Sequence, residues 1–301
     1  MATITRSQFV DTLDRNLNDI HQDGLKDWGE EYSKIFNVKN SDQSSEIDSY
    51  ISGFGSMPQK NEGADATFDA VIPGIKKTYS HLTYALGYEV TEEAIEDNQQ
   101  KPETFNKLPT ALSRSAIETV EVSAANIINN GFTTAGFDGK VLFATDHPKL
   151  GGGTQSNRPT TPVDLSVTSL TAGLTAVDKY TDERGLKLPT KAVQLVVPSD
   201  LWNVARELLG SDYKPYTANN ETNVLRDKNL TFCLLHYLSD VDAWFLLADK
   251  ASHMLTFYWR VRLGALRKDT DFDSTNLKHL QRMRFSVGYS HFMGTYGSPG
   301  A

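Results

Sequence analysis

The sequence predicts a mixed α+β fold, and three observations support this prediction. Residues 107–130 have the apolar spacing of one long amphipathic helix. Residues 82–90, 255–263 and 283–289 alternate apolar and polar side chains with a period of two, as half-buried strands do. Residues 168–250 combine helical patterns with short apolar runs, which predicts a small α/β unit beside the other elements.

The composition bounds the class of protein. The chain has 301 residues, of which 39% are hydrophobic, enough for a sizeable core and about two domains. The longest plain apolar run, residues 243–248, is far shorter than the ~20 residues of a membrane helix, so no membrane partner is expected. The first ten residues lack the apolar segment of a signal peptide. The single cysteine, Cys233, excludes an internal disulfide and is predicted to be a buried thiol.

Charge is distributed unevenly along the chain. The net charge of −8 disfavours a dedicated nucleic-acid binder. Residues 1–70 carry 6 basic and 13 acidic groups, whereas residues 259–284 carry 7 basic and 3 acidic groups. Either both segments are solvated faces, or the acidic arm of one copy meets the basic segment of another. Charge alone favours the first interpretation.

The N-terminal segment lacks a core of its own. A helix is predicted over residues 7–20, capped by Ser7, but residues 1–55 must pack on something else. Residues 53–70, GFGSMPQKNEGADATFDA, predict an exposed loop or hairpin tip. In the strand that follows, one side is predicted to be half-buried, and Thr91 is positioned to cap a short helix. That side carries Leu82, Tyr84, Leu86, Tyr88 and Val90.

The long helix over 107–130 has Pro109 in its predicted first turn and Gly131 at its end. It would span about 30 Å and needs a sheet to lie on. A short strand over residues 141–143 and a glycine-rich loop are predicted next, followed by a linker over residues 155–167.

The α/β unit is predicted to contain two helices and three strands. The first helix ends near Gly185, and the second is capped by Ser199 and closed by Gly210. Its strands are expected at residues 192–197, 232–237 and 243–247, the first of them central. A polar bend over residues 268–278 then separates two long antiparallel strands.

No catalytic, cofactor-binding or metal-binding residues are predicted. Asp146 and His147 could belong to a hydrolase, but no nucleophile motif accompanies them, and a structural turn in which Asp146 binds backbone amides is favoured. Asp269, Asp271 and Asp273 have the spacing of the first ligands of a calcium loop, but the sixth and twelfth positions lack the Gly and Glu that such a loop requires. The three glycines at 151–153 lack the Lys-Ser or Lys-Thr of a phosphate-binding loop.

Four stretches of the sequence carry a family resemblance. They are ALGYEVTEEAIEDN (85–98), VLFATDHPKLGGGTQSN (141–157), VVPSDLWNVARELLGSDYKPYTANNETN (196–223) and DAWFLLAD (242–249). In these stretches the chain resembles the major capsid (head) proteins of tailed bacteriophages, particularly the major head subunit of Mu-like phages. The resemblance extends from about residue 50 to the end of the chain.

The resemblance implies the Hong Kong ninety-seven type of phage capsid fold. Residues 1–55 would then be an N-terminal arm and residues 56–90 an extended loop. Residues 91–154 and 251–301 would form a peripheral domain, with a spine helix at about 107–130. Residues 155–250 would form an axial domain.

The implied function is structural. Pentamers and hexamers of the chain would tile an icosahedral head around double-stranded DNA, bound without sequence specificity. A separate scaffolding protein and a portal protein are the expected partners. Assembly is expected in the cytoplasm of the bacterial host and the mature protein in the virion. An encapsulin-like compartment shell is the alternative, and a hydrolase using His147 and Asp146 is a third possibility.

The resemblance makes charge complementarity between copies as good an interpretation as two solvated faces. The candidate intersubunit contacts are Lys60, Glu62, Asp65, Asp69, Arg260, Arg262, Arg282 and Arg284. Some relatives crosslink their subunits through Lys and Asn, for which Lys60 is the analogue. No Asn partner or catalytic Glu is evident, so no crosslink is expected.

Overall fold

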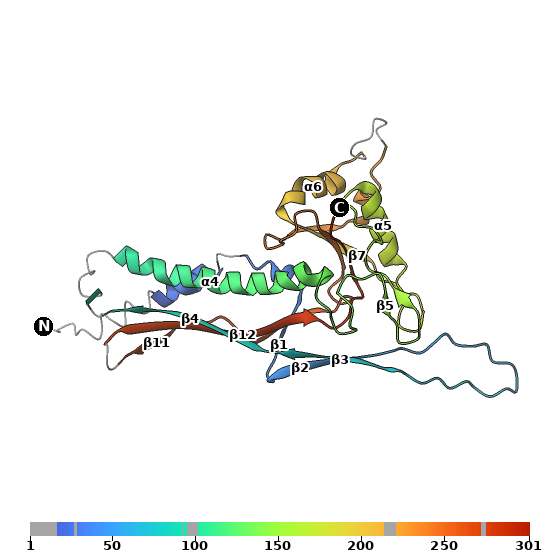
Figure 1. Ribbon diagram of the computed structural model, residues 1–301, viewed down its shortest axis with the longest axis horizontal. Helices are drawn as coiled ribbons and strands as arrows, with labels where there is room; N and C mark the ends of the chain where they lie inside the picture. Colours follow the sequence, from blue (N-terminus) through green and yellow to red (C-terminus); the bar gives the residue numbers. More distant parts are fainter. Residues whose placement is uncertain (1–16, 27–28, 92, 95–101, 214–220, 272–274) are drawn as a thin grey trace.

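The computed structural model describes residues 17–26, 29–91, 93–94, 102–213, 221–271 and 275–301. Figure 1 shows a long sheet with one long helix along it, a second and more compact body at one end, and a hairpin that projects beyond that body.

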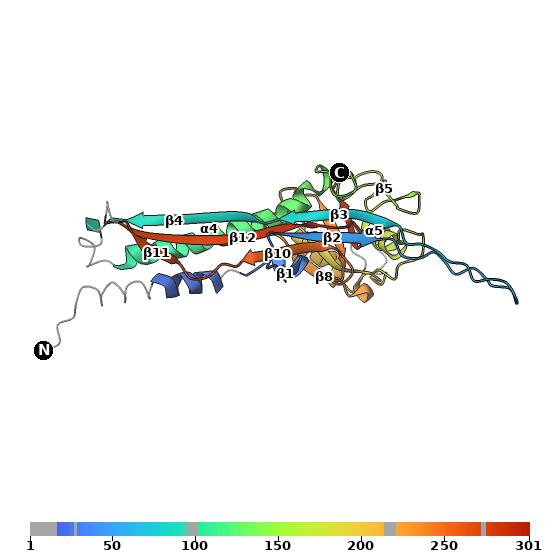
Figure 2. The same cartoon turned by 90° about the horizontal axis from the view of Figure 1, so that it is seen from below.

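The long sheet contains five strands. Their order is β1–β10–β12–β11, and β4 pairs with the other edge of β12. Their bounds are β1 Asn37–Asn40, β4 Leu82–Val90, β10 Leu255–Val261, β11 Arg267–Thr270 and β12 Leu277–Tyr289. Helix α4, Pro102–Asn129, lies along this sheet (Figures 1 and 2). Buried residues of β12 alternate with more exposed ones over most of its length, because α4 covers one face and the hairpin stem covers the other face only near the end of the strand, at Ser286 and Ser290.

The second body is built on a four-stranded sheet. Its strand order is β13–β9–β7–β8, in which β7 is parallel to β8 and antiparallel to β9. The strands are β7 Ala192–Val197, β8 Thr231–Leu234, β9 Trp244–Ala248 and β13 Thr295–Ser298. Helices α5, Val167–Asp178, and α6, Trp202–Gly210, belong to the same body.

Both faces of this second sheet are buried, which explains its continuous apolar runs. Leu195 and Val197 of β7 pack into a core with α5 and α6, as Trp244 and Leu246 of β9 do. Val196 on the opposite face joins a second core, which also contains residues of α4, β10 and β12. The two bodies therefore share one apolar core and hold each other in place.

A two-stranded ribbon precedes the long sheet in sequence. Strands β2, Ser45–Ile51, and β3, Pro73–Ser80, are antiparallel, and residues 52–72 between them form no strand. The exposed loop predicted at 53–70 is confirmed, but the strands of its stem were not predicted. The ribbon continues into β4 through His81, so the hairpin and the long sheet are joined directly (Figure 2).

The helices and strands predicted for the α/β unit are present, as are the two long antiparallel strands, although their bounds differ. The long helix begins at Pro102 rather than near 107, so Pro109 lies inside it. Two prolines seven residues apart both suit a first turn, and the sequence could not choose between them. The predicted side of β4 does face the helix-covered side of β12, although Leu82 and Leu86 remain exposed.

Several local predictions were wrong. Residues 141–143 form one isolated bridge, Val141 with Ala135, rather than a strand; Leu142 and Phe143 are apolar because they are buried. Ser199 begins a short 3-10 turn, Ser199–Leu201, and makes no capping hydrogen bond. Part of the predicted bend at 268–278 is strand β11. The C-terminal strand β13 was missed, and it pairs with β9 rather than with the long sheet.

Most of the N-terminal helix predicted at 7–20 lies outside the described residues. Residues 17–26 are helical, and Leu17 is buried as expected. The short helix α2, Tyr32–Ile35, follows and places Tyr32, Ile35 and Phe36 in the shared core. This segment therefore depends on the rest of the chain for its packing. Thr91 accepts a hydrogen bond from the backbone N of Ala94 at 3.2 Å, as expected of a cap.

Candidate functional site

The hairpin and the adjoining strand β4 expose many large apolar side chains. Nine large apolar side chains between residues 47 and 86 are exposed, and Met57 and Phe68 in the loop reach 98% and 94% exposure. The nine are Ile47, Ile51, Phe54, Met57, Phe68, Val71, Ile75, Leu82 and Leu86. Clusters of exposed apolar side chains of this kind mark surfaces that another molecule covers.

Strand β4 presents a second incomplete surface. In the described part of the chain no strand pairs with its outer edge, toward which alternate residues of an antiparallel strand direct their backbone N–H and C=O groups. The open side of β4 continues into grooves toward α4, lined by Leu82, Tyr84 and Leu86 on the strand and by Thr119 and Ser123 on the helix. The hairpin and the β4 edge form one continuous uncovered region.

The stem of the hairpin is held on the long sheet by buried and partly buried polar contacts. The Tyr79 hydroxyl lies 2.5 Å from the Ser290 hydroxyl, which donates to Asp48 at 2.6 Å. Tyr258 of β10 also donates to Asp48, at 3.3 Å. Burial raises the pKa of Tyr79 beyond its usual range, so the hydroxyl stays protonated and able to donate. A two-stranded ribbon is marginal alone, and these contacts fix its stem.

The four predicted contact residues of the loop differ in their surroundings. Lys60, Glu62 and Asp65 are exposed in the projecting part. Asp69 is engaged within the chain, where both of its oxygens contact the Arg184 guanidinium at 2.9 and 2.8 Å. Hydrogen bonding from the Gly55 amide, together with Arg184, lowers the pKa of Asp69.

The four predicted arginines lie on β10, β12 and the residue after β10. Arg282 and Arg284 occupy alternate positions of β12 whose neighbours Met283 and Phe285 are buried, so both point away from the covered face. Arg284 Nε donates to the His81 carbonyl at 3.4 Å, and Arg262 Nε donates to Asn40 Oδ1 at 3.1 Å. Arg260 lies at an irregularity between β10 and β12. The loop carboxylates and these arginines are not in contact within one chain in the contacts described.

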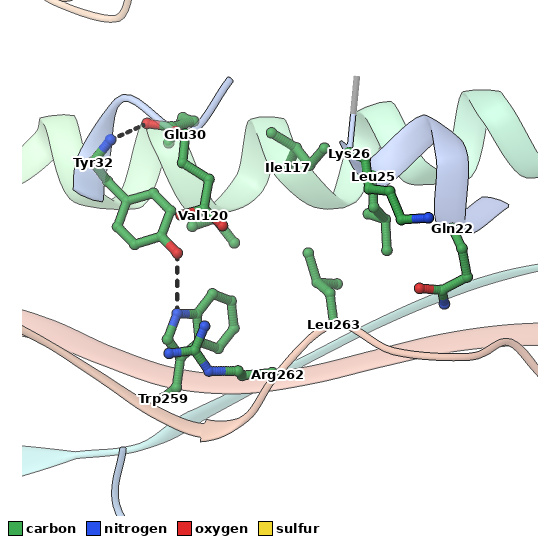
Figure 3. Close-up of a pocket in the computed structure, with 11 residues that line it drawn as sticks. Gln22, Leu25, Lys26, Glu30, Tyr32, Ile117, Val120, Trp259, Arg262 and Leu263 are labelled. Carbon is green, nitrogen blue, oxygen red and sulfur yellow. Dashed lines mark hydrogen bonds between the residues drawn. The ribbon is translucent and has the colours of Figure 1, made fainter. Parts of the chain in front are cut away.

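A cavity of 180 Å³ lies between residues 22–26, α4 and β10 (Figure 3). Tyr32 points across it toward Trp259, whose indole N–H donates to the Tyr32 hydroxyl at 3.1 Å. Glu121 of α4, also at this cavity, is 2% exposed and accepts from the backbone N of Glu31 at 2.8 Å and of Tyr32 at 2.9 Å. Burial raises the pKa of Glu121 to about 7. Glu121 therefore fastens the start of α2 to α4.

The Asp146 and His147 side chains do not act together. The Asp146 carboxylate pairs with Lys140 and not with backbone amides, which corrects the predicted turn. His147 is fully buried, with Nδ1 2.6 Å from Asp138 and Nε2 3.2 Å from the Leu142 carbonyl. Its ring also stacks on Phe292 at a centroid distance of 3.8 Å. This histidine is a packed core residue that does not reach solvent.

Within the described residues, no three His, Cys, Asp or Glu side chains are grouped so that they could hold a metal ion. Asp271 of the calcium-like run instead pairs with Lys278, and Asp273 lies outside the described residues. None of the helices described combines the length and apolar character needed to cross a bilayer. Cys233 is buried as predicted, and burial raises the pKa of its thiol.

Arg184 and Tyr79 were missed as site residues. Each acts through a partner more than one hundred residues away in sequence, Asp69 for Arg184 and Ser290 for Tyr79. The local pattern around Arg184, a polar turn before Gly185, gave no reason to single it out. Tyr79 lies in a polar stretch whose strand was itself missed.

Comparisons with known proteins agree with this geometry. The sequence profile of a family described as phage capsid protein matches residues 75–296. A search of curated proteins finds no match. The procapsid of bacteriophage JBD30 is similar in structure, with a TM-score of 0.54, 14% identity, and coverage of 98% of this chain and 76% of that chain.

Two further solved structures are similar across almost their whole length. The capsid of a native GTA particle has a TM-score of 0.59 and 14% identity, with 90% of each chain covered. A virus-like particle from Pyrococcus furiosus has a TM-score of 0.54 and 11% identity, with 94% of this chain and 98% of that chain covered. At such identities the likeness concerns the fold, and it confirms the α+β class of the Hong Kong ninety-seven capsid type. Because the family profile matches well over half of the residues, the chain belongs to the phage capsid protein family.

Proposed function

We propose that the chain is the major head subunit of a tailed phage, related to those of Mu-like phages, and that its copies close into an icosahedral shell of pentamers and hexamers. The observation that carries this proposal is the exposed apolar hairpin beside the unpaired β4 edge. Backbone groups and apolar side chains left open in one chain are satisfied when a neighbouring copy covers them. Membership of the phage capsid protein family supports a structural role without chemistry of its own.

The domain assignment follows from the same proposal. Residues 1–55 would be the arm and 56–90 the extended loop, with 91–154 and 251–301 as the peripheral domain and 155–250 as the axial domain. Two observations would refine these boundaries. The ribbon already begins at Ser45, and β13 lies in the sheet of the second body.

The contacts between copies are proposed to be partly electrostatic. Glu62 and Asp65 are exposed on the loop, while Arg282 and Arg284 point away from the covered face of the long sheet. Attraction between opposite charges would orient the loop of one copy on the sheet of the next. Lys60 would lie in the same contact without forming a covalent crosslink. Asp69 and Arg262 would help indirectly, through Gly55 and Asn40, to which they are hydrogen-bonded, and Arg260 is proposed as a further contact beside them.

The remaining partners are proposed from the family alone. A separate scaffolding protein would guide closure, a portal protein would occupy one vertex, and double-stranded DNA would fill the shell. Assembly would take place in the host cytoplasm and the mature protein would reside in the virion. The acidic chain suits confinement of DNA without strong attraction to it, since the wall and the DNA both carry negative charge.

Negative-stain microscopy with sedimentation of the recombinant chain tests the proposal, with and without the scaffolding protein of the same phage. We expect closed shells or rings of five and six. The double variant Met57→Ser/Phe68→Ser should lower the yield of shells, because it removes the most exposed apolar side chains of the loop. Val224→Ser/Val241→Ser, which also removes exposed apolar side chains, is the matched control and should assemble normally. A monodisperse monomer under every condition would contradict the proposal.

An encapsulin-like compartment shell is the second candidate, favoured by the similarity to the virus-like particle of Pyrococcus furiosus. Both candidates predict closed particles. Particles isolated from the natural host separate them, because a phage head protects long double-stranded DNA from nuclease and a compartment encloses a protein cargo.

A further inference from the structure

A rigid turn lies between α5 and β7, at residues 181–186. Asp182 Oδ1 accepts from the backbone N of Arg184 at 2.9 Å and of Leu186 at 2.8 Å. The Asp182 carbonyl accepts from the Gly185 N at 3.1 Å, and Gly185 has a φ of +86°, where glycine is favoured. This turn has a defined shape before anything binds to it.

One side chain of the turn anchors it inward. Glu183 is 3% exposed, and its carboxylate accepts from the Leu150 N at 2.6 Å and from His291 Nε2 at 3.0 Å. The Glu183 carbonyl accepts from the Gly151 N at 2.9 Å, and a Cβ at Gly151 would lie 2.5 Å from that oxygen. The turn is therefore fixed to the second body, to the glycine-rich loop and to the residues after β12.

The next side chain reaches outward to the hairpin. Arg184 binds both oxygens of Asp69 and lies 3.4 Å from the Ala70 carbonyl. Asp69 Oδ2 also accepts from the Gly55 N at 2.9 Å, on the opposite arm of the hairpin. The Arg184 Nη2 bonds both carboxylate oxygens while Nη1 faces the Ala70 carbonyl, so these charge-assisted hydrogen bonds fix Arg184 to two neighbouring residues of one arm. Arg184 thus holds one arm of the loop directly, and the Asp69 side chain links that arm to the other at Gly55.

We propose that Glu183 and Arg184 form a bracket that sets the direction in which residues 56–68 project from the body. Residues 56–68 form no strand and are all exposed, so their direction depends on the base of the loop, where this bracket and the Ser52–Ile72 hydrogen bonds lie. The second step rests on the proposed function: in a shell, the bracket presents Met57 and Phe68 to the neighbouring copy in one orientation. A preoriented loop loses less conformational entropy on docking than a free one.

Distances between two spin labels test the first step. Labels at Lys60→Cys and Ala172→Cys report the loop tip against α5, both sites are exposed, and Cys233 is buried away from the reagent. Labelled chains are diluted with unlabelled ones, so that only distances within one chain are measured. Arg184→Met and Asp69→Asn should each broaden the distance distribution by about twofold or more, because ordering entropy is returned to the loop. Lys140→Met removes a different surface ion pair and should leave the distribution unchanged.

Assembly rates test the second step. Arg184→Met should slow shell formation by about fivefold at equal concentration, while its melting temperature stays that of the Lys140→Met control. Unchanged distance distributions in both bracket variants would overturn the proposal. Broadened distributions with unchanged assembly would overturn the second step. If the wild-type chain never assembles, the proposed function fails, and the distances alone still decide whether the bracket exists.

Discussion

His147 and its neighbour Asp146 have opposite roles although they are adjacent in sequence. His147 is enclosed by Asp138, Leu142 and Phe292, whereas Asp146 lies at the surface beside Lys140. Burial works to raise the pKa of Asp138, but hydrogen bonds from His147 and from the Lys140 amide outweigh it and lower that pKa. The buried pair serves the packing of the loop that precedes β5, His147–Pro148.

Substitution of each residue in turn separates the two roles. His147→Ala removes a buried ring and its hydrogen bonds and should lower the free energy of unfolding by ~3 kcal/mol. Asp146→Ala removes only an exposed ion pair and should change it by less than ~0.5 kcal/mol. Urea denaturation of both variants measures the difference. Equal destabilisation by the two variants would contradict this assignment.

Glu121 predicts a pH dependence of stability. Burial raises the pKa of Glu121 in the folded chain to about 7, from 4.5 in the unfolded chain. Ionisation therefore costs more in the folded state, and its contribution to stability is fully present below pH 4.5 and lost as the pH rises through 7. The free energy of unfolding should fall by roughly 2–3 kcal/mol over this range through this one group.

Glu121→Gln isolates that contribution. Buried histidines such as His253, whose pKa is lowered to about 4 by burial, titrate with the opposite sign, so the difference between wild type and variant is the informative quantity. The variant should lose the downward slope between pH 4.5 and 7 relative to wild type. Parallel stability curves across this range would show that Glu121 stays ionised throughout.

At the scale of whole elements, segments with a strong apolar pattern were predicted well, whereas strands that are exposed on both faces were not. The long helix and the pair β10 and β12 each bury a regular apolar set and were found by its periodicity, and the central strand β7 was found by its nearly continuous apolar run. The ribbon β2–β3 buries little on either side, so its sequence looks polar and lacks a clear period. The strand predicted at residues 141–143 was wrong for the opposite reason. These residues are apolar because they are buried, and a buried segment without a partner strand has the same apolar run as a strand.

The ribbon should therefore depend on its few buried contacts. Tyr79→Phe removes the hydroxyl beside Ser290 and leaves that serine with one partner fewer, while the hydrogen bond from Ser290 to Asp48 is still available. Amide hydrogen exchange in β2 and β3 should speed up by about tenfold, as expected for one lost buried hydrogen bond, while α4 stays protected. Tyr213→Phe, at an exposed tyrosine, is the control. Unchanged exchange in the ribbon would show that backbone pairing alone holds it.

At the scale of the whole molecule, the candidate site could be predicted only in part. Charge and composition found the projecting loop and the basic strands, because both are local properties of the sequence. The bracket at Arg184 and the open edge of β4 could not be found in this way. Each depends on which distant segments the fold brings together, or fails to bring together.

Electrostatic docking between copies is the prediction that belongs to this scale. Arg282 is half-exposed on the uncovered face of β12, and Glu62 and Asp65 lie on the projecting loop. Arg282→Glu should slow assembly, because a charge pair between copies is lost. It should also weaken the dependence of the assembly rate on salt, because salt screens such pairs, with a Debye length of about 10 Å at 0.1 M. Lys179→Glu, which has the same change of charge on the second body, is the control for net charge. Light scattering over a salt series measures both variants. Adding Glu62→Lys and Asp65→Lys to the Arg282→Glu chain should restore part of the assembly, and this rescue would identify the two surfaces as partners. Equal effects of Arg282→Glu and Lys179→Glu would instead show that the two surfaces are separate solvated faces.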